Sequence, residues 1–99
     1  MAYNIILEDR AIVEIDDAFE WYESQKIGLG TDFMAELYDY LDLISQSPKI
    51  FPVDFKRYRR AVLKRFSKYV IIYSIEGTDI FVLSVFNTLQ NPNTRYRKS

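Results

Sequence analysis

Basic side chains gather in one short stretch of this 99-residue sequence. Positions 58–66 read YRRAVLKRF, which places Arg59, Arg60, Lys64 and Arg65 around a small apolar centre. Clustered guanidinium and ammonium groups neutralise phosphate charge, so this stretch predicts a surface that binds nucleic acid or another anionic target. A second interpretation stays open, because cations at the ends of a strand can simply protect a sheet edge from aggregation.

The composition excludes the commonest catalytic groups. The sequence has no His, which is the usual general base, and no Cys, which would supply a thiolate nucleophile or a zinc ligand. A catalytic site would have to use Lys, Arg, Tyr, Ser, Thr or carboxylates. If the protein cleaves RNA, the candidate catalytic residues are Arg60, Lys64, Arg65, Arg95 and Tyr96. We predict no cofactor and no metal site.

Charge divides sharply along the chain, although the net charge is only −1. Residues 1–48 hold eleven acidic and two basic side chains, whereas residues 49–99 hold eleven basic and three acidic ones. This asymmetry indicates a basic surface for an anionic or acidic partner, to which Arg97 near the C-terminus would also contribute. Alternatively, the two halves neutralise each other across the fold. The acidic residues of the first helix are interpreted as a solvated face.

Apolar periodicity predicts a single α+β domain over residues 1–99. A strand at 3–7 precedes helices at 9–25 and about 31–46, which are separated by the glycines of IGLG at 27–30. The segment 47–55 contains two prolines and is expected to be a loop. Three antiparallel strands at about 59–66, 68–75 and 79–86 complete a twisted sheet, with a hairpin of the longer-loop kind at 76–79. The predicted order is β-α-α-β-β-β, with the helices on one face of the sheet.

The last two predicted strands are apolar on both faces, which two helices cannot both cover. Residues 69–75 and 80–86 lack the apolar–polar alternation of a sheet with one solvated face. The second face therefore needs loops, self-association or another chain to cover it. Val13 and Trp21 fall toward the polar side of the first helix and also indicate a protein partner. Tyr73 is interpreted as a core residue with a satisfied hydroxyl.

Four consecutive blocks of the sequence resemble the RelE/ParE superfamily of toxins from bacterial type II toxin–antitoxin modules, often described as plasmid stabilisation proteins. The blocks are WYESQKIGLGTDF, LISQSPKIF, YRRAVLKRFSKYVIIYSI and IFVLSVFNTLQNP. No apolar run in the sequence is long enough to span a bilayer, so a cytoplasmic protein without membrane contact is expected. The resemblance implies a toxin that is held inactive by a cognate antitoxin, which folds as it binds. It leaves open a homodimer or a heterotetramer with the antitoxin. The residues expected to contact the antitoxin are Val13, Trp21, Tyr73 and Phe86.

Within that superfamily, one branch cleaves messenger RNA on the ribosome and another poisons DNA gyrase. Many members carry the pattern His-x-x-Arg-x-Pro after the last strand, but this sequence has Asn87 and Gln90 at the His and Arg positions. Neutral amides can hold a hydrogen-bonded geometry but cannot shuttle protons at neutral pH. The departure favours a ParE-like gyrase inhibitor over a ribosome-dependent endoribonuclease. A non-toxic member that only binds antitoxin is the third alternative.

Overall fold

The computed structural model describes residues 2–89, which form two helices and a five-stranded sheet. The elements in chain order are β1 (Asn4–Leu7), α1 (Asp9–Gln25), α2 (Leu29–Gln46), β2 (Val53–Phe55), β3 (Tyr58–Val62), β4 (Tyr69–Glu76) and β5 (Asp79–Asn87). The predicted α+β class is confirmed, as is the order of one strand, two helices and then strands. One strand was missed, because β2 lies in the segment expected to be a loop.

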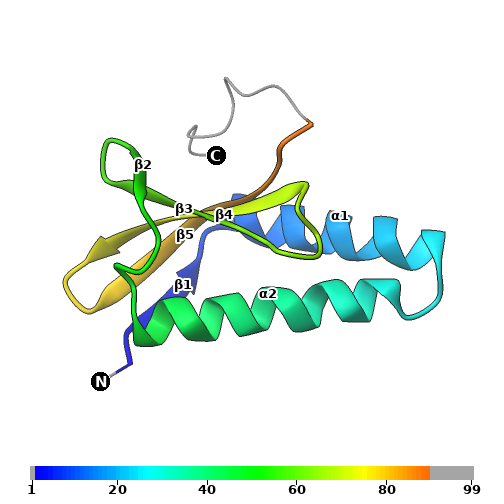
Figure 1. Cartoon of the computed structure of the whole chain (residues 1–99), viewed down its shortest axis with the longest axis horizontal. Coiled ribbons are helices and arrows are strands. Elements are labelled where there is room, and N and C mark those ends of the chain that lie inside the picture. The colour runs from blue at the N-terminus through cyan, green and yellow to red at the C-terminus, as the bar shows by residue number, and fades with distance from the viewer. Residues whose placement is uncertain (1, 90–99) are drawn as a thin grey trace.

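The sheet joins the beginning of the chain to its last strand. The strand order is β1-β5-β4-β3-β2, with β1 parallel to β5 and the other neighbours antiparallel. Figure 1 shows α1 and α2 lying side by side against one face of the sheet. We call this the helix-covered face and the opposite one the outer face. No helix among residues 2–89 combines the length and apolar character that crossing a membrane requires.

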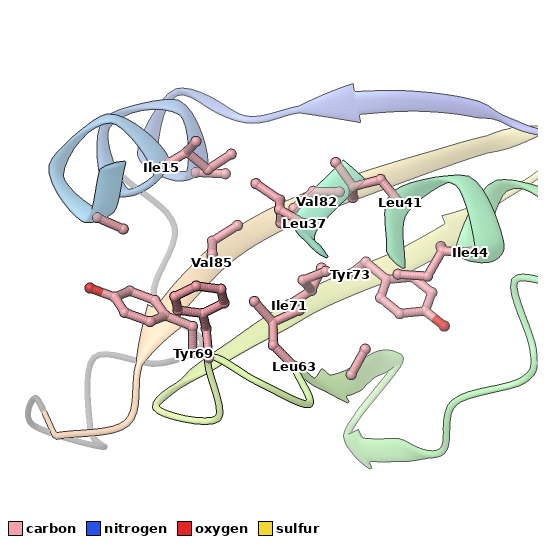
Figure 2. Close-up of a cluster of buried hydrophobic side chains, with 14 of the residues drawn as sticks. Ile15, Leu37, Leu41, Ile44, Leu63, Tyr69, Ile71, Tyr73, Val82 and Val85 are labelled. Carbon is pink, nitrogen blue, oxygen red and sulfur yellow. The ribbon is translucent and has the colours of Figure 1, made fainter. Parts of the chain in front are cut away.

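The main core lies between the helices and the helix-covered face. Helix α2 buries Phe33, Leu37, Leu41 and Ile44, which recur at the three- and four-residue spacing of one helix side. Their side chains meet those of the sheet, as Figure 2 shows for Leu37, Leu41 and Ile44 opposite the strand residues. Burying each such side chain contributes about 1.5–3 kcal/mol, so this layer supplies most of the stability of the fold. The strand residues of this layer include Ala61, Ile71, Tyr73, Ile80, Val82 and Val85.

A carboxylate closes the turn between the helices. Gly28 has a φ of +91°, a backbone conformation that glycine adopts without steric cost. The Glu23 side chain accepts hydrogen bonds from the Gly28 and Gly30 amides, with N–O distances of 3.0 Å to each. These amides belong to the N-cap residue and the first turn of α2, where helical partners are absent and a negative charge is favourable. The two helices are therefore tied together at their connection.

Two turns differ from the sequence prediction. Glu76 pairs directly with Asp79, so the β4–β5 hairpin has a two-residue loop instead of the longer loop expected. Gly77 begins that loop with a φ of +63°, as a tight hairpin turn requires. Strand β3 also ends at Val62, four residues before the predicted end, because the following backbone turns toward α2. There Glu36 accepts hydrogen bonds from the amides of residues 65 and 66.

The outer face of the sheet carries a second apolar cluster, as the two-sided apolar pattern of the strands predicts. Its five residues are all buried, namely Tyr58, Val70, Ile72, Leu83 and Phe86. Large apolar side chains are instead exposed on the helices, as at Val13 and Trp21, and beside the sheet edge, as at Val53 and Val62. The apolar surface open to a partner therefore lies on the helices and at the β2–β3 edge.

Candidate functional site

The basic stretch after β2 divides its side chains among different surroundings. Arg59 shares the helix-covered face with its cross-strand neighbour Tyr73. Its Nη1 donates hydrogen bonds to the carbonyl oxygen of Phe51 at 2.7 Å and to that of Lys49 at 3.4 Å. These bonds satisfy backbone groups that no strand pairs and fasten the segment before β2 to β3. The observed contacts of Arg59 therefore stabilise the fold.

Arg65 lies in the turn beyond β3, next to α2. Its guanidinium Nη1 is 3.2 Å from a carboxylate oxygen of Asp32, and both side chains are more than half exposed. An exposed pair of this kind contributes about 0–1 kcal/mol. The Arg65 backbone amide makes a stronger contact than this exposed ion pair. It donates to both oxygens of the Glu36 carboxylate, at 3.0 and 3.1 Å. Lys64, the preceding residue, is exposed.

Arg60 lies on the outer face, opposite its cross-strand partner Ile72. Its Nε is buried and has no hydrogen-bond partner among the described residues. The side chain lines a groove of about 330 Å³ at the β2–β3 edge. The other residues that line this groove are Phe51, Pro52, Val53, Asp54 and Val62.

The structure does not bring the candidate nuclease residues to one point. Arg60 lies on the outer face, whereas the Arg65 guanidinium is paired with α2 on the opposite side of the sheet. Arg95, Tyr96 and Arg97 lie outside the described residues. Within residues 2–89, the guanidinium groups of Arg60 and Arg65 therefore do not converge on one catalytic point.

A small polar cavity that sequence reasoning missed lies where α1 crosses the end of β5. It measures about 50 Å³ and is lined by Glu14, Asp17, Tyr69, Val85 and Asn87. These residues come from three elements and show no common spacing, so the sequence singled out only Asn87 and, as part of the acidic helix face, Asp17. A cavity of this size has room for about one or two water molecules.

Hydrogen bonds hold the polar groups that line this cavity. Glu14 Oε1 accepts hydrogen bonds from Ser84 Oγ at 2.7 Å and from the Val85 amide at 3.1 Å. The Asn87 amide nitrogen lies 3.5 Å from the Tyr69 hydroxyl, and burial raises the pKa of Tyr69 while that hydrogen bond opposes the rise. A neutral phenol and an amide at the end of β5 do not exchange protons near pH 7.

The residues expected to contact an antitoxin fall into two groups. Val13 and Trp21 are each 58% exposed, two turns apart on α1. The structure corrects the expectation for Tyr73 and Phe86, because both side chains are 0% exposed and offer no surface. The interpretation of Tyr73 as a core residue is confirmed, since its hydroxyl donates to the Pro48 carbonyl at 2.7 Å.

The outer side of α1 is acidic around these two residues. Asp16, Asp17 and Glu20 are exposed between Val13 and Trp21. Within residues 2–89, no three acidic side chains gather closely enough to hold a metal ion. An exposed Trp surrounded by carboxylates forms a surface that suits a partner segment with both apolar and basic side chains.

Comparison with known proteins places this geometry in a family. No curated protein matches the sequence. The fold resembles a chain of the chromosomal ParDE TA system from P. aeruginosa, with a TM-score of 0.75 at 12% identity, covering 87% of this chain and 96% of that one. The family model described as the ParE toxin of the type II toxin–antitoxin system, parDE, matches residues 5–92. This protein therefore belongs to the ParE toxin family of type II toxin–antitoxin systems.

Proposed function

We propose that this protein is a toxin that inhibits DNA gyrase and that a cognate antitoxin neutralises it in the cytoplasm. Membership of the ParE family supports the general role, and the chemistry of the residues favours the target. The observation that carries the choice of target is the last residue of β5, where the Asn87 amide nitrogen lies 3.5 Å from the hydroxyl of the neutral phenol Tyr69.

Cleavage of RNA needs a group that takes the proton of a 2′-hydroxyl and others that stabilise the charged phosphate. Asn87 cannot take a proton, and burial makes Tyr69 a weaker acid than an ordinary tyrosine. The described cations Arg60 and Arg65 lie on different sides of the sheet. Inhibition of gyrase by binding needs no proton transfer, only a complementary surface.

The target surface that we propose is the basic region around β3. Residues 49–68 carry eight Lys and Arg side chains and one acidic residue, Asp54. Lys64 is exposed and is the clearest candidate for contact with the target, since Arg59 and Arg65 already bind carbonyl and carboxylate groups of this chain. Arg60 and, by its sequence position, Arg97 complete the proposed target-binding set.

The antitoxin surface that we propose is the outer side of α1, centred on Val13 and Trp21. A large exposed indole is costly in water and gains free energy when a partner covers it. The neighbouring carboxylates would attract a basic antitoxin segment and orient it. A segment that orders only on binding remains releasable, as control of a toxin requires.

The proposal is tested by inducible expression of the protein with and without the neighbouring reading frame. We expect growth arrest in its absence, relief in its presence, and loss of gyrase supercoiling when purified protein is added. Cut messenger RNA in primer extension, with normal supercoiling, would instead establish the endoribonuclease alternative. Normal growth without the neighbour would identify a non-toxic member that only binds antitoxin.

A further inference from the structure

The free edge of the sheet at β2 combines a strand edge, an apolar groove and a half-buried arginine. In the sheet order β2 is terminal, and no described strand pairs with its far edge. All three residues of β2 are exposed. An exposed strand edge is a template for an added strand, since its backbone groups can pair with those of an extended peptide.

The ladder between β2 and β3 fixes which backbone groups point outward. The Arg60 amide donates to the Pro52 carbonyl at 3.1 Å, and Val53 pairs with Arg59. In an antiparallel ladder this places Val53 in a non-hydrogen-bonded pair, so its own N–H and C=O point away from β3. Val53 therefore presents one donor and one acceptor to whatever lies beyond the edge.

The groove beside this edge selects the chemistry of the occupant. Four of its six lining residues are apolar, namely Phe51, Pro52, Val53 and Val62. Arg60 supplies a cation that lines the groove. A carboxylate is the acceptor that fits a guanidinium best, so the groove favours an acidic side chain beside Arg60.

We propose that this edge binds an extended segment of a partner protein that carries a glutamate or aspartate between aliphatic residues. The segment adds to β2 through the outward N–H and C=O of Val53, and its carboxylate meets Arg60 in the groove. This goes beyond the proposed function, since neither gyrase inhibition nor control by an antitoxin on α1 requires a β-strand partner here.

A nucleic acid fits the same edge less well. A phosphate oxygen can accept a hydrogen bond from the outward Val53 amide, but the phosphodiester backbone of DNA has no donor for the outward Val53 carbonyl. The basic residues nearby speed the approach of an acidic peptide as well as that of DNA. The edge geometry is therefore what distinguishes the two occupants.

The test uses the full chain and a blocked, fluorescein-labelled heptapeptide of valines and threonines with a central glutamate. We expect saturable fluorescence anisotropy, weakened about tenfold when the central residue is glutamine and further when it is lysine. The Arg60→Gln variant should lose the preference for glutamate over glutamine. The matched control Lys26→Gln removes one charge from the helical hairpin and should leave binding unchanged.

Backbone pairing is tested without changing the protein. Methylation of alternate peptide amides should abolish binding in one phase and spare it in the other, because only one set of N–H groups faces β2. The Val53→Pro variant removes the outward N–H without removing a ladder bond and should weaken binding at least tenfold. Equal loss in both methylation phases would overturn strand addition. So would Arg60-dependent binding of labelled oligothymidine that the peptide cannot displace.

Discussion

Ser84 Oγ lies 2.7 Å from Glu14 Oε1, which joins α1 to the last strand across 70 positions of sequence. The same carboxylate oxygen accepts the Val85 amide at 3.1 Å. The last residue of β5 paired with β1 is Val82, so the edge of β5 beyond it needs another partner. Glu14 therefore takes the place of a missing neighbouring strand.

Replacement of Glu14 by Ala should lower the free energy of unfolding by about 1.5–3 kcal/mol, because a hydrogen-bonded charge is lost and a strand amide is left unpaired. Urea denaturation followed by circular dichroism measures the change. Glu20→Ala, which removes an exposed carboxylate from the same helix, should change it by less than about 0.5 kcal/mol. Equal effects would show that the Ser84 contact is not special.

The fold should lose stability in alkaline solution through Tyr73. Burial raises the pKa of its hydroxyl to about 12, from an ordinary value of 10.0. The native state therefore holds this proton more tightly than the unfolded chain, so the free energy of unfolding is unaffected below pH 10 and falls as the pH rises toward 12.

Tyr73→Phe should remove part of that alkaline slope. It should also cost about 0.5–1.5 kcal/mol at neutral pH, because the Pro48 carbonyl loses its donor. Tyr22 and Tyr69, whose pKa values burial also raises, remain in the variant and keep a residual slope. Denaturation curves at pH 8, 10 and 11.5 provide the comparison, and an unchanged slope in Tyr73→Phe would contradict the assignment.

Gly30→Ala should destabilise the helical hairpin even though alanine is the better helix former. A Cβ at position 30 would lie 2.7 Å from the carbonyl oxygen of Phe19, a backbone atom that cannot move without α1. Overpacking of this kind costs about 1–3 kcal/mol, which outweighs a propensity gain of at most about 1 kcal/mol. Thermal unfolding should show a lower midpoint, whereas Thr31→Ala at the next, exposed position should change it little.

Trp21→Ala should weaken antitoxin binding and leave the fold intact. The side chain is 58% exposed, so its removal should change the free energy of unfolding by less than about 0.5 kcal/mol. A buried aromatic anchor in a complex is worth about 2 kcal/mol or more, a loss of at least about thirtyfold in affinity. Calorimetric titration with the product of the neighbouring gene measures it, with Tyr38→Ala on α2 as a control of equal exposure. Unchanged affinity in Trp21→Ala would show that the antitoxin does not bind this side of α1.

Lys64→Glu should relieve the proposed inhibition of gyrase without unfolding the protein. The residue is exposed, and reversal of its charge replaces attraction to an anionic target by repulsion. The concentration for half-maximal inhibition of supercoiling should rise about tenfold or more, while the melting temperature stays within a few degrees. Lys26→Glu at the helical turn changes the net charge equally and should retain inhibition. If both variants lose it equally, net charge and not the β3 region controls the interaction.

Periodicity predicted those parts of the fold in which apolar residues repeat at a regular spacing along the chain. The two helices and the strands β4 and β5 fall in this class, because their apolar residues repeat at helical or strand spacing. Strand β2 was missed because Pro48 and Pro52 mark its surroundings as a loop, and its three residues owe their conformation to pairing with β3. The early end of β3 depends on Glu36, a residue of α2 that lies 29 positions away in sequence from its partner Arg65.

The candidate site was predicted less completely than the fold, for a related reason. A run of cations is visible in the sequence, but the binding of Arg59 by the Phe51 carbonyl and of Arg65 by Asp32 depends on tertiary contacts. The apolar character of both faces of β4 and β5 was visible too. How fully Phe86 is covered depends on packing that no local pattern records.

The parallel pairing of β1 with β5 means that the sheet cannot be completed until nearly the whole chain has been synthesised. During translation the helical hairpin emerges early, yet the strand that must lie beside β1 and receive Glu14 is made near the end. Contacts between residues so distant along the chain form slowly, because the entropy cost of closing the loop comes before the contacts can stabilise it. A nascent chain that stops before β5 therefore cannot complete its sheet. A truncated messenger RNA would yield a protein without the complete fold.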